Sequence, residues 1–128
     1  MPKAKQLTIP CRNRPGTLAQ IAKVLGDAKV NIVCCLTTSS GARGAVQVVV
    51  DNVNRARKAL AAAGLPCRQS DVLYVTLPNK PGALGRFAGK LARKKINITQ
   101  GYATAARGSG RAGLLLAVSN VNKAARVK

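Results

Sequence analysis

The chain contains very few of the side chains that enzymes use for acid–base chemistry. Its 128 residues include no His, no Glu and only three Asp, at Asp27, Asp51 and Asp71. General acid–base catalysis usually relies on a His or on a carboxylate with a tuned pKa. The three Asp residues are widely separated in the sequence, so no carboxylate pair can be assembled from neighbours. We therefore assign no catalytic residue and no cofactor, and we predict that the protein is not an enzyme.

The usual sequence patterns of metal sites are also absent. The four cysteines, Cys11, Cys34, Cys35 and Cys67, form no Cys-x-x-Cys pair, and there is no His to complete a zinc site. Free cysteines are often buried and behave as small hydrophobic side chains. We expect reduced, mostly buried thiols and no metal site.

Long apolar runs are missing as well. No stretch approaches the roughly 20 apolar residues that a membrane-spanning helix needs. The first residues, 1–5, are basic but lack the apolar segment of a signal peptide. These absences predict a cytoplasmic protein with no membrane partner.

Acidic residues are so few that the chain is strongly basic, with 22 Lys and Arg and a formal net charge of +19. Such a charge favours either a general solvated basic surface or a polyanion partner such as nucleic acid. The basic residues are dispersed, and their longest run is only 93–95. Arg86, Lys90 and Arg93 form a stripe that we interpret as the solvent face of a helix. The dispersal predicts weak, sequence-independent and salt-sensitive binding of nucleic acid.

What the chain does contain is an internal repeat. Residues 13–18, Asn-Arg-Pro-Gly-Thr-Leu, return 66 positions later as Asn-Lys-Pro-Gly-Ala-Leu at 79–84. The same offset relates Lys-Val-Asn-Ile at 29–32 to Lys-Ile-Asn-Ile at 95–98. After a slip of two residues, the segment that begins at Asp51 matches the one that begins at Ser119. A repeat of this length determines the architecture of the protein.

Each copy has the hydrophobic pattern of strand, helix, strand, strand and helix, and the first copy continues into a further strand. Apolar residues at helical spacing, including Leu18 in the first copy and Leu84 in the second, predict the inner face of the first helix. Asp51 or Asn52 is expected to cap the second helix of the first copy, and Ser119 the last helix of the second. The expected strands and hairpin segments are residues 6–12, 30–38, 43–50, 66–69, 72–77, 96–104 and 113–118.

This order predicts an α+β fold made of two ferredoxin-like βαββαβ units in tandem, with antiparallel sheets and helices on one face. We place the units at residues 1–70 and 71–128. The second unit is expected to be truncated after its last short helix, and to lack most of helix 2 and the final strand. Seven strands are therefore expected, and residues 72–77 should lie at a sheet edge or borrow a neighbour. Because a bare edge invites pairing, this also favours a homodimer.

The repeated turn is the candidate site. Pro15 and Pro81 are expected at the first helical position, followed by Gly16 and Gly82, whose missing side chains allow close approach to the backbone. The first amides of a helix, with the positive end of its dipole, attract a carboxylate. An Asn two residues before each Pro offers both a donor and an acceptor. These groups match a small amino acid, although the same motif is also simply a good helix start that was duplicated.

The two motifs, each followed by Val/Ile-Asn-Ile about fifteen residues later, resemble the signature of ACT domains, which are small regulatory modules that bind amino acids. The resemblance extends over residues 6–124, and the layout is similar to the small tandem ACT proteins that lack a catalytic domain. It implies allosteric regulation by a ligand held between the turn of one unit and a second unit. Carried over by position, the implied ligand-binding residues are Asn13, Gly16, Asn31, Asn79, Gly82 and Asn97. Each turn has an Asn where the family often has Asp.

A second interpretation is a nucleic-acid-binding protein that uses a basic ferredoxin-like surface, because RNA-recognition motifs have the same element order. Those modules stack bases on exposed aromatic residues of the sheet. Here the aromatic residues are only Tyr74, Phe87 and Tyr102, and the hairpin return strands at 44–50 and 112–118 contain none. The aromatic content therefore favours the amino-acid interpretation.

Overall fold

The computed structural model describes residues 2–127, which divide into two compact units. The N-terminal unit is Lys5–Ser70, and the C-terminal unit is Asp71–Lys128 together with Met1–Ala4. The elements in chain order are β1 (Lys3–Arg12), α1 (Thr17–Asp27), β2 (Ile32–Ser40), β3 (Arg43–Val50), α2 (Val53–Ala62), β4 (Arg68–Pro78), α3 (Ala83–Arg93), β5 (Ile98–Thr104), β6 (Arg111–Val118) and α4 (Val121–Ala125).

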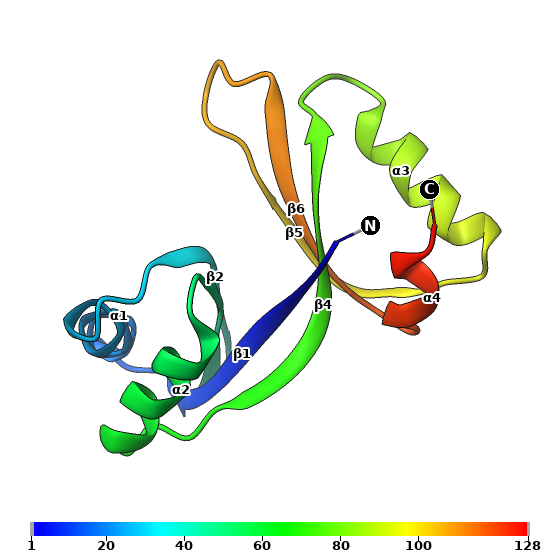
Figure 1. Ribbon diagram of the computed structural model, residues 1–128. Coiled ribbons are helices and arrows are strands. Elements are labelled where there is room, and N and C mark those ends of the chain that lie inside the picture. The colour runs from blue at the N-terminus through cyan, green and yellow to red at the C-terminus, as the bar shows by residue number, and fades with distance from the viewer. Residues whose placement is uncertain (1, 128) are drawn as a thin grey trace. The chain divides into compact units, whose positions relative to one another are not determined.

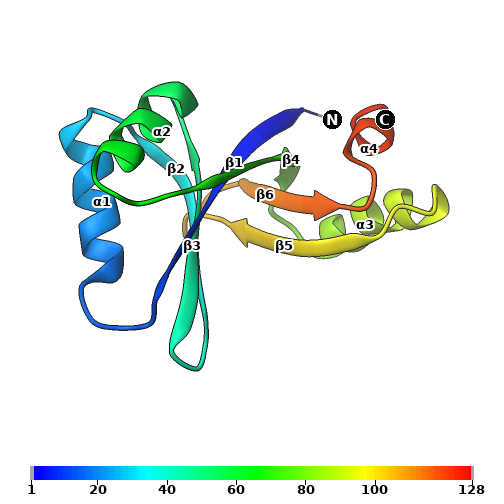
Figure 2. The same ribbon diagram turned by 90° about the horizontal axis from the view of Figure 1, so that it is seen from below.

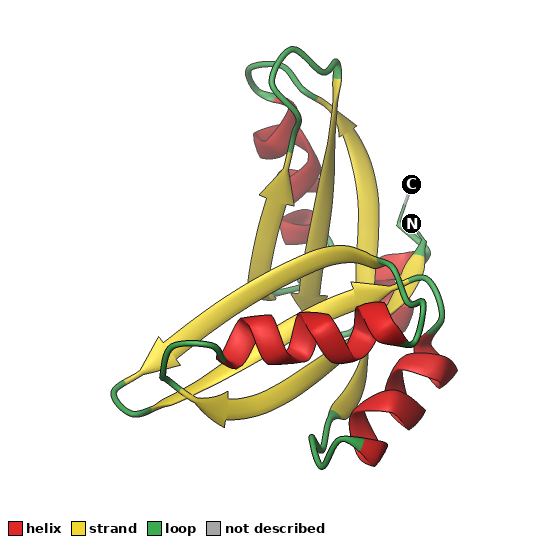
Figure 3. Ribbon diagram, turned by 90° about the vertical axis from the view of Figure 1, so that its left-hand side faces the viewer, coloured by secondary structure: helices red, strands yellow, loops and turns green. Residues whose placement is uncertain are grey.

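In the N-terminal unit the strands follow the order β2-β3-β1-β4. Strand β3 pairs antiparallel with both β1 and β2, and Leu7 lies opposite Val48. Both helices, α1 and α2, cover the same face of these strands (Figure 1, Figure 3). This is the predicted ferredoxin-like arrangement with helices on one face.

The core of the N-terminal unit follows from the alternation of side chains along a strand. Every second residue of the β1 and β3 segments that pair points toward the helices, where it meets the apolar stripes of α1 and α2. The fully or almost fully buried members of this core are Leu7, Ile9, Ile21, Leu25, Val30, Val46, Val48, Ala56 and Leu60. Burial of these side chains provides the main driving force for folding of the unit.

The C-terminal unit repeats this design. Strand β6 pairs antiparallel with β4 and β5, and Leu73 lies opposite Leu116. Helix α3 packs its apolar stripe, including Phe87 and Leu91, on the strands, while α4 contributes only one buried residue, Ala124. Figure 2 shows α4 following β6 directly.

The start of β1 supplies the C-terminal unit with an additional strand segment beside β4. The amide of Tyr74 donates a hydrogen bond of 3.1 Å to the carbonyl of Pro2. The Lys3 Nζ donates one of 3.2 Å to the Oδ1 of Asn122 in α4. The prediction that residues 72–77 would borrow a neighbour is therefore confirmed. Within residues 2–127 strand β4 has a neighbour on each side, so the open edge that was the reason for expecting a homodimer is not present there.

Two details of the predicted element pattern were wrong. Residues 2–127 contain six strands rather than seven, because Arg68–Pro78 forms one continuous strand in place of the two expected at 66–69 and 72–77. The last helix is capped by Asn120, whose Oδ1 accepts from the amide of Lys123, and not by Ser119. Ser119 instead accepts a hydrogen bond from the amide of Asn97. At the start of α2 the cap is Asn52, as expected.

None of the helices within residues 2–127 has the length and the apolar character that crossing a membrane requires.

Candidate functional site

Each Asn-x-Pro-Gly motif forms a tight turn before a helix. In the first copy the amide of Thr17 donates to the carbonyl of Arg14 at 3.4 Å, and Gly16 has φ 89° and ψ −9°. These angles, with Pro15 before the glycine, define a type II turn, which favours glycine at its third position. The second copy repeats the geometry, with φ 85° and ψ −14° at Gly82.

This geometry corrects the predicted helix start. Helix α1 begins at Thr17 with Gly16 as its N-cap, so Pro15 precedes the helix and is not its first residue. The positive φ also gives each glycine a conformational reason to be there. A Cβ built on Gly16 would meet nothing within 4 Å, whereas one on Gly82 would meet the flexible end of Arg86 at 2.7 Å. The space above the first turn is therefore open.

The helices that follow these turns start without a side-chain cap. Within residues 2–127 neither first turn has a side-chain cap hydrogen bond, because the N-caps are Gly16 and Gly82. The amides of Thr17 and Ala83 donate to backbone carbonyls of the turn. By contrast, Asn52 caps α2 and Asn120 caps α4 through their side-chain oxygens. First-turn amides without a partner carry the positive end of the helix dipole and are suited to an anion. Among the four helices of the described chain, the two without a side-chain cap are the two that follow the repeated turns.

The Asn of each motif ties the turn to a hairpin. The Asn13 Nδ2 donates to the carbonyl of Gly41 at 3.0 Å, and its backbone amide donates to Ala42 at 2.9 Å. The Asn79 Nδ2 donates to the carbonyl of Ser109 at 3.0 Å. An Asp could not make this side-chain bond because an ionised carboxylate only accepts. The Oδ1 of each Asn accepts no hydrogen bond from residues 2–127 and remains available to a donor.

Each turn borders a small cavity within its own unit. The first has a volume of about 190 Å³ and is lined by Asn13, Gly16 and Leu18, with Thr37 and Thr38 at the end of β2. Its size matches a small ligand rather than a drug-sized one. This cavity brings together two of the predicted site residues, Asn13 and Gly16.

The second cavity has a volume of about 280 Å³ and lies at the equivalent place in the C-terminal unit. Its lining includes Asn79, Lys80 and Leu84, with Ala103 and Thr104 at the end of β5. Gly82 forms the turn but does not line this cavity. The two copies thus build the same kind of site from the same positions.

The first leucine of each helix was missed as a site residue. Leu18 and Leu84 were expected on the inner helical face, but their side chains are 43% and 56% exposed. They lie in the first turn of their helices, where in α3 the preceding Ala83 takes the buried position at 8% exposed, and each leucine lines its cavity. The available signal was their position directly after the turn, in both copies. The strand ends that complete the cavities carried no sequence signal.

Asn31 and Asn97 lie elsewhere in their units. Each precedes the strand that follows the first helix, at the end of the unit opposite the turn, and neither lines a turn cavity. The backbone of Asn31 bonds to Asp51 through two hydrogen bonds, of 3.0 and 3.1 Å. That of Asn97 bonds likewise to Ser119. The side chains of both Asn residues are exposed. Within one unit, neither residue contributes to the turn cavity.

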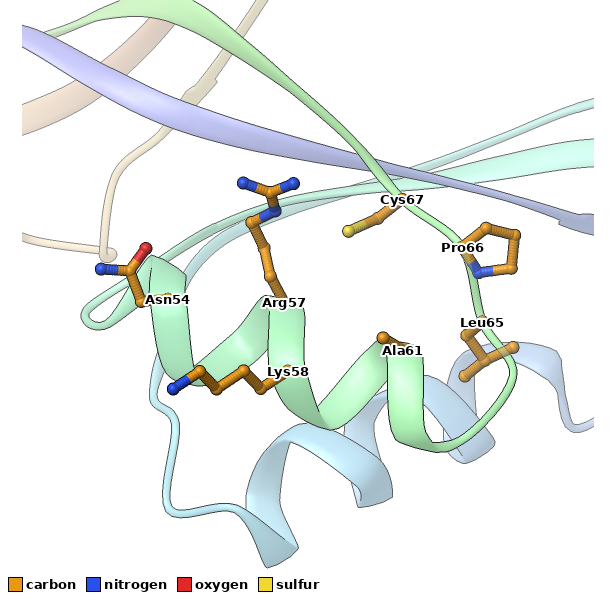
Figure 4. Close-up of a pocket in the computed structure, with 7 residues that line it drawn as sticks. All are labelled: Asn54, Arg57, Lys58, Ala61, Leu65, Pro66 and Cys67. Carbon is orange, nitrogen blue, oxygen red and sulfur yellow. The ribbon is translucent and has the colours of Figure 1, made fainter.

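Two larger cavities lie away from the turns. One, of about 590 Å³, lies between α2 and the segment that follows it, and contains none of the predicted site residues. Figure 4 shows Arg57 of α2 extending toward the side of Cys67. The Arg57 Nη1 donates to the Oε1 of Gln69 at 3.2 Å, which holds this side chain against β4. The other cavity, of about 620 Å³, lies between α3 and α4.

The four thiols are free, but the expectation that most are buried was wrong: only Cys34 is buried, Cys11 and Cys67 are half-buried, and Cys35 is exposed. Cys34 is buried, and its burial raises the pKa of the thiol, with a smaller contribution from the charge of the neighbouring Cys35. Cys35 is exposed because it lies on the opposite face of β2. Within residues 2–127 there is no group of three or more His, Cys, Asp or Glu side chains that could hold a metal ion.

Comparison with known proteins agrees with the repeat and the fold. A family model described as an ACT domain pair matches residues 3–128. The crystal structure of a protein from Bacteroides thetaiotaomicron is similar, with a TM-score of 0.90, 28% identity, and coverage of 96% of this chain and 84% of that chain. No curated protein matches the sequence.

The fold is also that of the ligand-free regulatory subunit of aspartate kinase from Thermus thermophilus. That structure has a TM-score of 0.70 and 15% identity, and the match covers 96% of this chain and 89% of that chain. The family model spans nearly the whole sequence and includes both repeated turns. The chain therefore belongs to the ACT domain pair family.

Proposed function

We propose that the protein is a non-catalytic regulatory module that binds a small amino acid at its Asn-x-Pro-Gly turns. The observation that carries this proposal is the contrast between helix starts: α1 and α3 lack side-chain caps, whereas α2 and α4 have them. Membership of the ACT domain pair family supports a regulatory, ligand-binding role. So does the fold shared with an aspartate kinase regulatory subunit.

A zwitterion can satisfy the groups that each turn leaves open. Its carboxylate would accept hydrogen bonds from the first-turn amides of α1 or α3, where the helix dipole favours negative charge. Its ammonium would donate to the Oδ1 of Asn13 or Asn79, which has no other donor within residues 2–127. Its side chain would rest against Leu18 or Leu84. Cavities of about 190 and 280 Å³ favour a small side chain.

The remaining predicted site residues would come from a second unit. Because Asn31 and Asn97 are exposed and lie far from the turn of their own unit, each could only contact a ligand held at a turn elsewhere. This arrangement also gives the proposed regulation a physical basis, since a ligand that contacts two units favours the state in which they adjoin. The second unit can belong to the same chain or to a homodimer partner. We propose units with the boundaries 1–70 and 71–128, in a cytoplasmic protein.

The alternative, nucleic-acid binding through a ferredoxin-like surface, has less support. Phe87 is only 7% exposed and belongs to the helix side of the core. The Tyr74 ring lies against Gly113, where an added Cβ would be 2.7 Å from its hydroxyl. Phe87 is therefore not free to stack on a base, and Tyr74 and Tyr102 are each half-buried.

A thermal-shift screen of the twenty amino acids tests the proposed function, because a ligand that binds the folded state raises the melting temperature. The exposed Leu18 and Leu84 provide the variants. Leu18→Trp/Leu84→Trp should fill both turn cavities and remove the shift produced by the active amino acid. Val33→Trp is the matched control, since Val33 is 46% exposed and borders neither cavity. An unchanged shift in the double variant would contradict the proposed site.

The glycines of the turns are less useful for this test. Replacement of Gly16 by Val would place a β-branched residue at φ 89° and strain the turn, whether or not a ligand binds there. A lost response could then reflect a distorted turn. The leucine variants avoid this ambiguity because they leave the turn backbone unchanged.

A further inference from the structure

The cavity between α3 and α4 has a lining that is almost entirely cationic. Its volume is about 620 Å³, and Figure 2 shows that α4 lies near the C-terminal half of α3. The residues that line it are Lys90, Arg93, Lys94, Lys123, Arg126 and Val127. Five of these six side chains carry a positive charge, and we refer to the cavity as the cationic groove.

The part of the chain that the structure describes places no acidic side chain in the cationic groove. All five basic side chains are exposed. Two of the three acidic residues are engaged in the N-terminal unit, where Asp27 pairs with Lys23 at 2.9 Å and Asp51 accepts from the amide of Asn31 at 3.0 Å. The third, Asp71, belongs to the C-terminal unit but does not line the groove. The groove therefore concentrates like charges that repel one another unless an anion is bound.

The fold itself does not require these cations. Basic residues near the end of a helix can stabilise it through the helix dipole. However, α1 and α2, the equivalent helices of the N-terminal unit, have no basic residue in their last turns and are at least as long as α3 and α4, respectively. The positions equivalent to the five cations are Val24, Asp27, Ala28, Arg55 and Lys58. Three cations of the groove are thus replaced by two apolar residues and an acid in the other copy.

We propose that the cationic groove binds a compact polyphosphate group, such as the phosphate chain of a nucleotide or inorganic polyphosphate. Lys supplies point charges and Arg supplies paired donors, which together suit phosphate oxygens. A concave wall lets one short anion contact several cations at once. The groove offers no aromatic side chain and no side-chain acceptor, so the ligand is recognised through its phosphates and not through a base.

The groove is separate from the amino-acid site. The turn of the C-terminal unit precedes α3, whereas the groove lies at the opposite end of that helix. The same unit would therefore hold one zwitterion and one polyanion at the two ends of α3. Loss of one site should leave the other intact, so failure of this proposal and failure of the proposed function are distinguishable.

Calorimetric titration with inorganic tripolyphosphate, at about 50 mM salt, tests the proposal with two repeat-matched double variants. Lys123→Gln/Arg126→Gln removes two charges from the groove. Arg55→Gln/Lys58→Gln removes two charges from the equivalent positions of the N-terminal unit. The groove variant should bind roughly ten-fold more weakly and the control less than about two-fold, since each exposed ion contact is worth up to about a factor of five. Equal losses would show that only net charge matters and would overturn the proposal.

A second groove variant guards against an effect on the short helix α4. Lys90→Gln/Lys94→Gln changes only α3 and its C-cap, and it should weaken tripolyphosphate binding to a similar extent. Unchanged binding by this variant would overturn the proposal that cations of α3 and α4 bind the same ligand. Circular dichroism of each variant establishes that the fold is retained.

The choice of ligand distinguishes the sources of the phosphate group. ATP and tripolyphosphate should bind with similar affinity and compete with each other, while AMP should bind far more weakly. Tight binding of a mixed-sequence RNA strand that persists at about 200 mM salt, without competition by tripolyphosphate, would overturn the proposal in favour of a nucleic-acid surface. The same result with polyglutamate would overturn it in favour of an acidic protein partner.

Discussion

The two units have the same fold and the same turn but differ where their first and second helices end. In the N-terminal unit this region has two cations, one acid and two apolar residues, and in the C-terminal unit it has five cations. The turns, in contrast, keep the positive φ at glycine, the Asn-to-hairpin hydrogen bond and the uncapped helix in both copies. The turns, which both copies share, therefore point to the proposed amino-acid site. The five cations, which only the second copy has, point to a separate property of the C-terminal unit.

The second helices differ as well. Helix α2 has 10 residues and places two side chains in its core, whereas α4 has 5 residues and places one. The first helices, α1 and α3, have 11 residues each. The C-terminal unit thus has a less extensive helical cover, and it also includes Lys3 and Ala4 at the start of β1. This difference should be visible in the stability of equivalent core positions.

The largest expected effect comes from the paired core leucines. Leu25 and Leu91 occupy equivalent positions and are both fully buried. Replacement of either by Ala should lower the free energy of unfolding by about 2–5 kcal/mol, measured by urea denaturation. Leu25→Ala should cost more, because α2 places Ala56 and Leu60 around it and α4 provides only Ala124.

The control for this pair is Leu84→Ala, which should change the free energy of unfolding by only about 0.5 kcal/mol because Leu84 is 56% exposed. A greater loss for Leu91→Ala than for Leu25→Ala would contradict the view that the C-terminal core is the less extensively covered one.

A smaller effect of opposite sign is expected at the ends of the first helices. Lys29 and Lys95 both adopt a left-handed conformation with φ 60°. In each case the amide of the next residue returns to the helix, as in the 2.9 Å bond from Val30 to the carbonyl of Leu25. Glycine is favoured at this position. Lys29→Gly and Lys95→Gly should therefore each raise the free energy of unfolding, by about 0.5–1 kcal/mol.

Urea denaturation of the two single variants measures the predicted increase in the free energy of unfolding. Lys23→Gly, in the helix interior, is the control and should lower it. If only one of the two substitutions stabilised the protein, the equivalence of the two helix ends would be wrong.

The sequence alone was sufficient to predict the repeat, the ferredoxin-like fold and the hairpin strands, because these depend on the period of apolar residues. It was not sufficient to predict which residue of a first helical turn faces the core, so Leu18 and Leu84 were placed on the inner helical face, whereas in α3 the buried residue is Ala83. Likewise, the Pro-Gly pair allowed either a helix start or a type II turn. The observed φ at Gly16 distinguishes the two only once the backbone is known.

The binding groups were predictable in part. Asn13 and Gly16 do lie together at one cavity, because they belong to a single turn. The hydrogen bond from the Asn13 Nδ2 to Gly41 was not predictable, since it joins residues far apart in the sequence. The cationic groove was also not predictable. The sequence revealed a basic stripe on one helix, but its union with Lys123 and Arg126 requires the packing of α4 beside α3.

The smallest expected effect concerns pH. The pKa of Cys34 is raised, chiefly by burial, so the folded protein holds this proton more tightly than the unfolded chain does. This contribution to stability is fully present below the ordinary thiol pKa of about 8.5 and is lost as pH rises through the folded value. The C-terminal unit has Gln100 at the equivalent position, and this side chain does not ionise, so it makes no pH-dependent contribution to stability. In Cys34→Ala the decline in melting temperature between about pH 8 and 10 should be shallower than in the wild type. An equal or steeper decline would contradict this role for burial of the thiol.

The contrast between uncapped and capped helices gives the most direct test of amino-acid binding at the turns. The measurement is a titration of the ¹⁵N-labelled protein with each small amino acid, followed by the shifts of backbone amide resonances. We predict that at least one amino acid shifts the first-turn amides of α1 and α3, at Leu18 and Leu84, and leaves the capped first turns of α2 and α4 unchanged. Shifts confined to α2 and α4, or no shift with any amino acid, would contradict the account.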